Sequence, residues 1–498
     1  MGSLFSWRRL VSKEEPVTKQ SPPMPNSKQP CQGNHKATTR QVTAKAWTSQ
    51  PYSAYKDSGV EWLGEVPEHW QVQRLKRICR LAYGDALASI SRNAGTVPVM
   101  GSNGQVGFHN SANTLAPCIV VGRKGSFGKV NYSADSVFAI DTTFFIDNRH
   151  SSAHLRWLYY LLGWLELDGA TKDSAIPGLD REDAYQKCAA VPPLPEQGAI
   201  AHFLDHATQR IQHHIQAKQK LIKLLEEKKQ VIIHQAVTGQ INVQTGQPYS
   251  TYKDSGVEWL RRVPEHWETG MVKRGYDIKL GKMLQIKPNN ANDIEVSYLK
   301  AKDVQWFSVQ LISGVKMWAS PEDIEQLSVS SGDLLVCEGG EGGRCGILTS
   351  AVNGHIIQNS LHRVRSRDGN SNVFLQYTMR AIAETGWFVA LNNKATIAHF
   401  TCEKFGALRI PFPGPLEQSA IADFLTHTNH RISRHRAAVK REIDLLHEYR
   451  TRLIADVVTG KLDMREVAAH LPKGDPLPPD SNCQDGTDLA DPRRSPHP

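Results

Sequence analysis

The sequence YKDSGVEWL occurs at residues 55–63 and again at 252–260, 197 positions later. The match extends in both directions: between 52–70 and 249–267, sixteen of nineteen positions are identical, and only positions 54, 64 and 65 differ from their counterparts. Repeats of 20–50 residues are typical of solenoid proteins, whereas one repeat at a distance near 200 residues indicates two copies of a whole domain. The repeated stretch therefore predicts two related domains in one chain.

A second pair of matching segments has the apolar period of an α-helix. EQGAIAHFL at 196–204 matches EQSAIADFL at 417–425, 221 positions later, and each helical run continues to a matching VTG. A helix of about 40 residues would be about 60 Å long, and its narrow apolar stripe is typical of packing along another long helix. The residues expected in this coiled coil are Ile200, Leu204, Ile211 and Leu225 in the first helix and Ile421, Leu425, Ile432 and Leu446 in the second.

Two variable stretches, roughly 71–193 and 268–415, are rich in glycine and in short β-like runs. At an offset of 218, Gly122, Gly125 and Gly128 align with Gly340, Gly343 and Gly346. Glycine at this spacing favours a tight strand–turn–strand connection; the alternative is a loop that passes close to a DNA backbone. Basic side chains suit phosphate and guanine contacts, and the candidates are Arg123, Lys124 and Lys129 in the first stretch and Arg344, Arg363 and Lys394 in the second.

The charge of the chain is unevenly distributed. The formal net charge is +9 over 498 residues, of which residues 1–50 hold +6 and residues 472–498 hold −2, so the body carries +5. A mildly basic body is compatible with nucleic acid, provided that the charge gathers in a local patch. Both ends of the chain are poor in large apolar residues and are expected to be disordered.

Other classes of protein are excluded by what the sequence lacks. No apolar run is long enough for a membrane span, and the eight cysteines contain no Cys-x-x-Cys pair, which indicates a reduced, cytoplasmic protein without a zinc site. The stretch GRKGSFGKV at 122–130 has the wrong spacing for a P-loop. No common catalytic motif is present, so we expect no catalytic residue and no metal ligand in this chain. The paired tryptophans, Trp62 with Trp259 and Trp70 with Trp267, are expected in the core or at a docking surface.

Together these segments resemble the specificity (S) subunits of type I restriction–modification systems. The resemblance is carried by YKDSGVEWLGEVPEHW at 55–70, by PPLPEQGAIAHFLD at 192–205 and by the long helices that close in VTG, and it covers about 52–463. The second copy departs from it in FPGPLEQ at 412–418, and the N-terminal extension is not part of the pattern.

The resemblance implies a mixed α/β fold with a pseudo-two-fold internal repeat. Two similar target recognition domains would be held apart by two long, antiparallel coiled-coil helices. The boundaries expected are a disordered extension at 1–50, the first recognition domain at 51–193, the first long helix at 194–242, a linker and the second recognition domain at 243–415, the second long helix at 416–463 and a disordered tail at 464–498.

The resemblance also implies a function without catalysis in this chain. Each domain would read one half of an asymmetric, bipartite site in double-stranded DNA. Two modification (methyltransferase) subunits and two restriction (translocase–nuclease) subunits would join it to methylate adenine or cleave DNA. The cofactors S-adenosylmethionine, ATP and Mg²⁺ would belong to those partners.

Two other interpretations remain open from the residues alone. The chain could be a coiled-coil scaffold whose globular domains bind proteins; such a scaffold would lack the salt-dependent DNA affinity that phosphate contacts produce. The chain could also be an enzyme whose site has no recognisable motif, in which case the isolated chain would cut or methylate DNA.

Overall fold

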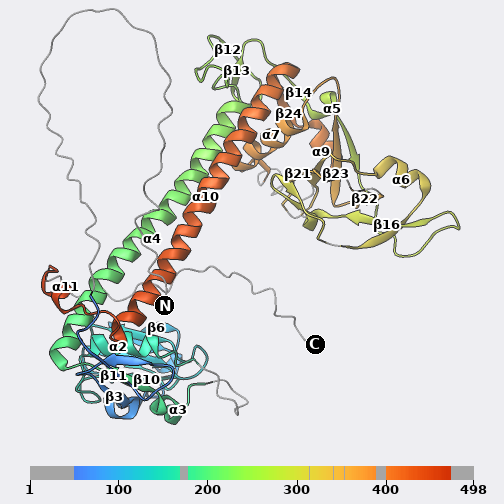
Figure 1. Cartoon of the computed structure of the whole chain (residues 1–498). Helices are drawn as coiled ribbons and strands as arrows, with labels where there is room; N and C mark the ends of the chain where they lie inside the picture. Colours follow the sequence, from blue (N-terminus) through green and yellow to red (C-terminus); the bar gives the residue numbers. More distant parts are fainter. Residues whose placement is uncertain are drawn as a thin grey trace, which may run out of the picture. The chain divides into compact units, whose positions relative to one another are not determined.

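The computed structural model describes residues 50–168, 178–312, 314–339, 341–350, 352, 354–388 and 400–472 (Figure 1). The predicted N-terminal extension falls outside the described residues except for Gln50, and most of the predicted C-terminal tail also falls outside them. The first residues of that tail are folded, contrary to the prediction, because α11 (Arg465–Ala469) packs on the long helix α4 and buries Met464 and Ala468.

The first globular region, the described residues of 52–191, is built from short strands and helices. In chain order these are β1 (Tyr55–Asp57), β2 (Glu65–Pro67), β3 (Gln71–Arg74), α1 (Leu75–Ile78), β4 (Ala82–Tyr83), the 3-10 helix η2 (Ser89–Ser91), β5 (Val97–Gly101), β6 (Gly104–His109), β7 (Cys118–Gly122), β8 (Val130–Ser133), β9 (Phe138–Ala139), β10 (Thr143–Ile146), α2 (Leu155–Trp164), α3 (Arg181–Gln186) and β11 (Cys188–Val191).

The second globular region, the described residues of 249–412, follows the same plan. Its elements are β12 (Tyr252–Asp254), β13 (Arg262–Pro264), β14 (Glu268–Met271), α5 (Val272–Gly275), β15 (Tyr276–Leu280), β16 (Ile294–Leu299), the 3-10 helix η3 (Ala301–Asp303), β17 (Val304–Gln305), β18 (Ser308–Val309), β19 (Lys316–Ala319), α6 (Pro321–Leu327), β20 (Leu334–Cys337), β21 (Cys345–Ile347), β22 (His355–Ile357), β23 (Leu361–Ser366), α7 (Asn372–Glu384), α9 (Cys402–Ala407) and β24 (Arg409–Phe412).

The two regions share their strand order. A four-stranded sheet has the order β4-β10-β7-β8 in the first region and β15-β23-β20-β21 in the second. A three-stranded sheet, β6-β5-β9, corresponds to β19-β16-β22, and in both the middle strand has one antiparallel and one parallel neighbour. The central strands β7 and β20 are short, continuously apolar and fully buried, as expected for strands covered on both faces.

The structural register corrects the alignment of the glycine triplets. Val121 pairs with Val130 in the first region and Val336 pairs with Cys345 in the second, which sets the offset at 215 rather than 218. Gly128 therefore corresponds to Gly343, and Arg123 corresponds to Glu338. The sequence alignment was wrong here because glycines at a spacing of three match themselves equally well after a shift of three.

An insertion between β16 and β19 accounts for most of the extra length of the second region. It contains η3 and the hairpin of β17 and β18, which packs on β20 and β21. The ring of Phe307 in this hairpin lies 5.0 Å from that of Tyr377 on α7, and Lys229 of the long helix α4 lies 5.1 Å from the Phe307 ring. The insertion therefore joins the second sheet to the helices behind it.

Two helices of 44 residues each, α4 (Leu194–Val237) and α10 (Pro415–Val458), run side by side in Figure 1. Each has proline in its first turn, where the missing amide costs nothing. The helices are antiparallel, because Gln212 contacts Arg450 whereas Glu226, further along α4, contacts Arg436. At 1.5 Å per residue each helix is about 66 Å long.

The globular regions contact different parts of α4. In the first region, Arg156 and Tyr160 of α2 both bond to Asp205, near the start of α4. In the second region, the core includes Ile233 and Val237 at the end of α4. The predicted fold class, a mixed α/β chain with a long coiled-coil helix, is confirmed.

Candidate nucleic-acid interface

The repeated stretch has a structural role that explains much of its recurrence. The carboxylate of Glu196, in the first turn of α4, accepts hydrogen bonds from Tyr52 Oη at 2.5 Å and Trp70 Nε1 at 3.1 Å, and lies 2.9 Å from His69 Nε2. Glu196 is only 6% exposed. Burial, followed by the hydrogen bond to Glu196, raises the pKa of Tyr52 far above its usual range, so the hydroxyl remains a donor.

The far end of the other long helix closes the same junction. Gly460, which follows α10, has φ +78°, and a Cβ there would lie 2.4 Å from the Pro67 ring. Only glycine fits both the left-handed backbone and this contact. The first copy of the repeat thus ties the start of α4 to the end of α10.

The second copy forms the equivalent junction with weaker bonding. Glu417 of α10 accepts from Tyr249 Oη at 2.5 Å and lies 3.1 Å from His266 Nε2, while Gly239 after α4 packs on Pro264. Among the described residues, the buried indole nitrogen of Trp267 has no hydrogen-bond partner, unlike that of Trp70. The two junctions together fix both helix ends and hold the globular regions in place.

The tryptophans predicted in the core or at a docking surface fall into both environments. Trp70 and Trp267 are fully buried, and Trp259 is nearly so. Trp62 is 55% exposed, and its ring lies 5.4 Å from that of Trp164.

The glycine turn between β7 and β8 presents three of the predicted basic residues. Gly125 and Gly128 have φ of +74° and +76°, as the tight-turn interpretation requires. Lys124 and Lys129 are exposed and Arg123 is partly exposed. Lys129 Nζ donates to both the carbonyl and the side-chain oxygen of Asn103 at 3.0 Å, which holds the β5–β6 loop against the turn.

An aromatic residue and a second arginine lie beside this turn. The guanidinium carbon of Arg123 is 4.9 Å from the centre of the Tyr83 ring, and that of Arg181 is 5.1 Å from the same ring. Tyr83 is about half exposed. Arginine stacked on an exposed aromatic ring is a common element of nucleic-acid interfaces. Sequence reasoning missed Tyr83 and Arg181, because nothing in the local sequence connects residues so far apart.

The corresponding turn of the second region is closed. Arg344 donates to Glu341 at 3.2 Å and to the Ala301 carbonyl at 3.0 Å, and its side chain is only 20% exposed. Trp306 Nε1 donates to Glu341 at 2.7 Å. The insertion therefore holds this turn from the side, and Arg344 serves the fold in the position where the sequence suggested a DNA contact.

Of the two remaining basic candidates of the second region, the structure describes Arg363 and does not bring it to this surface. Arg363 is 4% exposed and donates to the Ser328 carbonyl at 2.6 Å; burial lowers the pKa of its guanidinium. Its place in the centre of β23 explains why it points inward. Lys394 lies outside the described residues.

The predicted coiled-coil residues differ in burial along the helices. Ile200, Leu204 and Ile211 are buried in α4, and Ile421, Leu425 and Ile432 are buried in α10. Leu225 and Leu446 are only partly buried. Both long helices are buried toward their two ends, where the globular regions cover them, and are more exposed in the middle, where Leu225 and Leu446 lie.

Neither a metal site nor a membrane helix emerges from the described parts of the chain. In residues 50–472 as described, no three His, Cys, Asp or Glu side chains gather as metal ligands would. Among the same residues, no helix has the length and hydropathy that a bilayer crossing needs.

Comparison with known proteins identifies the family of the first region. Residues 67–223 match the family model described as "Type I restriction modification DNA specificity domain". A solved structure reported for the complex assembly and conformational transition of the type I R-M system is 14% identical, covers 80% of this chain and 99% of its own, and has a TM-score of 0.57. The HsdS subunit from Thermoanaerobacter tengcongensis is also 14% identical, covering 80% of this chain and 98% of its own, with a TM-score of 0.49. The first likeness shows a shared fold, and over residues 67–223 the family match agrees with the resemblance found in the sequence.

Proposed function

We propose that this chain is the DNA specificity subunit of a type I restriction–modification system, because residues 67–223 match the family model of that specificity domain. The observation that carries the proposal is the pairing of two regions with one strand order and different surfaces. Two such regions in one chain suit the reading of two unlike half-sites. The target is then asymmetric and bipartite.

Phosphate contacts and base contacts fall to different residues in this proposal. Lys124, exposed on the first glycine turn, suits a backbone phosphate, which positions the domain without reading sequence. Arg123 and Arg181, stacked about Tyr83, suit base edges in the major groove, where arginine pairs with guanine. Arg344 and Arg363 have no such role, since the fold occupies their guanidinium groups.

The long helices set the distance between half-sites. The first region bonds to Asp205 and the second packs on Ile233, 28 residues later on α4. At 1.5 Å per residue this is about 42 Å, slightly more than one turn of B-DNA, for which about 34–36 Å is typical. The half-site centres should therefore lie a little over one helical turn apart.

The chemistry belongs to partner subunits. We propose two modification subunits that flip a target adenine into their own sites, and two restriction subunits for cleavage. S-adenosylmethionine, ATP and Mg²⁺ are used by those partners and not by this chain, and the assembled complex works in the cytoplasm.

The test is base-resolution methylome sequencing of a host that expresses this chain with its modification subunit. The matched control host expresses the modification subunit alone. A split, asymmetric motif methylated only when this chain is present supports the proposal and supplies both half-sites. If the partner is assembled with this chain and active, and no new motif is methylated, the proposal fails and the scaffold interpretation gains.

A further inference from the structure

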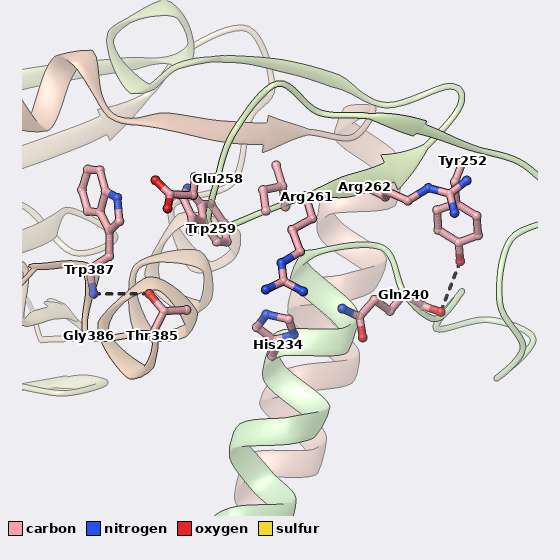
Figure 2. A pocket seen from close by; sticks show the side chains of 11 residues that line it. His234, Gln240, Tyr252, Glu258, Trp259, Arg261, Arg262, Thr385, Gly386 and Trp387 are labelled. Carbon is pink, nitrogen blue, oxygen red and sulfur yellow. Dashed lines mark hydrogen bonds between the residues drawn. The ribbon is translucent and has the colours of Figure 1, made fainter.

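A cavity of about 970 Å³ lies beside the second copy of the repeated stretch. Its walls come from the end of α4, from residues 258–262 and from the turn after α7 (Figure 2). Figure 2 shows the Arg261 side chain reaching toward His234, with Trp387 at the other end of the cavity. Burial lowers the pKa of His234, so its imidazole is neutral near pH 7.

This cavity lies where the two copies of the repeat differ most. Among nineteen aligned positions, the first copy has Gly64 and Glu65 and the second has Arg261 and Arg262. The change from glycine and glutamate to two arginines adds three positive charges. A difference so concentrated in an otherwise matching stretch indicates a local role for the arginines.

Arg261 occupies a backbone position that suits glycine. Its φ is +58°, close to the +66° of Gly64 in the first copy. A residue with a Cβ is strained in this left-handed conformation. The second copy thus has a strained arginine where the first copy has a glycine. Strained backbone positions of this kind are common at binding sites.

Both guanidinium groups are available for a ligand. Arg261 and Arg262 are exposed. The Arg262 guanidinium carbon lies 5.7 Å from the centre of the Tyr252 ring, which orients it without neutralising it. The acidic residue in the described lining is Glu258, so the cavity remains cationic.

The cavity adjoins the closed glycine turn of the second region. The rings of Trp387 and Phe388 lie 5.9 Å apart, and a Cβ at Gly343 in that turn would lie 2.8 Å from the Phe388 ring. The turn itself carries Glu338 and Glu341, whereas the first turn carries Arg123 and Lys124. In the second region, positive charge is thus found not on the turn but at the end of this cavity opposite Trp387.

We propose that this cavity binds a phosphate group through Arg261 and Arg262, and that in the working complex the phosphate belongs to the DNA backbone flanking the second half-site. The second part rests on the proposed function. A guanidinium group binds phosphate oxygens with two parallel hydrogen bonds. A phosphate is favoured over an acidic protein segment because the turn of the second region, unlike the cationic first turn, carries Glu338 and Glu341 among its described residues.

The test compares the full chain with R261G/R262E, which installs the residues of the first copy. Because Gly64 and Glu65 occupy the same backbone in the first copy, the variant should fold, and glycine at 261 removes strain. The matched control is K440Q/R452E on α10, which makes the same change of charge at exposed positions elsewhere.

The first readout is the affinity for a 40-base-pair duplex over a series of salt concentrations. Loss of one or two phosphate contacts should reduce the slope of log affinity against log salt by roughly 1–2 in R261G/R262E, with no such change in the control. The second readout is the thermal midpoint in added inorganic phosphate, which should rise for the unchanged chain and the control but not for the variant.

The outcomes separate the source of the phosphate. If phosphate stabilisation is lost but the DNA slope is unchanged, the cavity takes a free phosphate and the DNA assignment is overturned. If neither readout distinguishes the variant from the control, the phosphate site is overturned, and an acidic protein partner becomes the better explanation. If the unchanged chain shows no salt-dependent DNA affinity yet phosphate still stabilises it through these arginines, the proposed function fails while the phosphate site stands.

Discussion

The two glycine turns occupy the same place in two sheets of the same strand order, yet they present opposite surfaces. The first reads RKGSFGK at 123–129, with Lys124 exposed, Arg123 partly exposed and Lys129 bonded to Asn103; the second reads EGGEGGR at 338–344 and is held by the insertion. Backbone hydrogen bonds coincide position by position: Arg123 N donates to Thr142 and Glu338 N donates to Ser360. The backbone hydrogen bonds of the turn are therefore preserved, while its net charge changes from positive in the first region to negative in the second.

This difference separates two kinds of constraint. The backbone frame depends on glycine at a few turns and on the junctions with the long helices, and these recur in both halves. The side chains of the turns can differ between the two regions because neighbouring residues, such as those of the insertion, provide hydrogen-bond partners for them. For a protein with two recognition surfaces, such a division allows each surface to change its ligand without loss of the fold.

The largest expected effect concerns the two junctions. E196A leaves the buried donors of Tyr52 and Trp70 without an acceptor and should destabilise the first junction by about 3 kcal/mol, since hydrogen bonds to a charged group are worth roughly 1.5–3 kcal/mol each. E417A should cost only about 1 kcal/mol, because the Glu417 side chain is 25% exposed, compared with 5% for Glu196, so water can replace it. Hydrogen exchange of peptides 52–70 and 249–267 measures each loss locally.

The exposed Glu61 in the same stretch provides the control for this comparison. E61A should leave exchange in both peptides unchanged, because no structural bond depends on that carboxylate in the described residues. Equal losses in E196A and E417A would contradict the difference between the junctions.

The next effect tests why glycine recurs in both turns. A Cβ at Gly128 would lie 2.4 Å from the backbone of Asp168, and one at Gly343 would lie 2.8 Å from the Phe388 ring, which can move. G128A should therefore cost about 3 kcal/mol and G343A about 2 kcal/mol, combining left-handed strain with overpacking. G125A should cost about 1 kcal/mol, since nothing lies within 4 Å of its Cβ position.

The midpoint of urea unfolding, followed by tryptophan fluorescence, orders these three variants. G125A is the matched control for strain without collision, because it shares a positive φ with Gly128. A G125A variant as unstable as G128A would show that the close approach of Asp168 does not matter.

The third effect concerns charge on the turns. R123E/K124G gives the first turn the residues of the second, and the slope of log affinity for duplex DNA against log salt should fall by roughly 1–2. R344Q is the comparison in the second turn and should leave that slope unchanged, because its guanidinium is already bonded to Ala301 and Glu341. A reduced slope in R344Q, or an unchanged slope in R123E/K124G, would contradict the proposal that the first turn contacts DNA and the second does not.

The sequence predicted the frame better than the surfaces. The matching segments EQGAIAHFL and EQSAIADFL predict two long helices, because the apolar residues in each helical run recur with the 3.6-residue period of an α-helix. The sequence shows that the segments of Tyr52, Trp70 and Glu196 each occur twice, but it does not show that these residues touch. They lie more than a hundred positions apart, and only the folded structure brings them together.

The surfaces were beyond local reasoning for a physical reason. A basic residue next to glycine looks the same in sequence whether solvent or a carboxylate faces it. Arg344 and Lys129 hold corresponding positions, but Glu341 and an insertion some forty residues earlier decide the surroundings of Arg344. Arg363 likewise faces inward because of the strand on which it lies.

The smallest effect tests asymmetry within the helix pair itself. Arg436 donates to Glu226 at 2.7 Å across the pair, whereas the counterparts of these residues at an offset of 221 are Ile215 and His447, which cannot form an ion pair. Glu226 also lies 3.7 Å from Lys229 on its own helix. E226Q should cost at most about 0.5 kcal/mol, because such partly exposed ion pairs are screened by solvent and offset by side-chain entropy. E227Q, one position further on an exposed face, is the matched control for the loss of one negative charge. A urea midpoint lowered equally in both variants would assign the effect to net charge, and a loss above about 1 kcal/mol in E226Q alone would mean that this one pair fixes the register of the two helices.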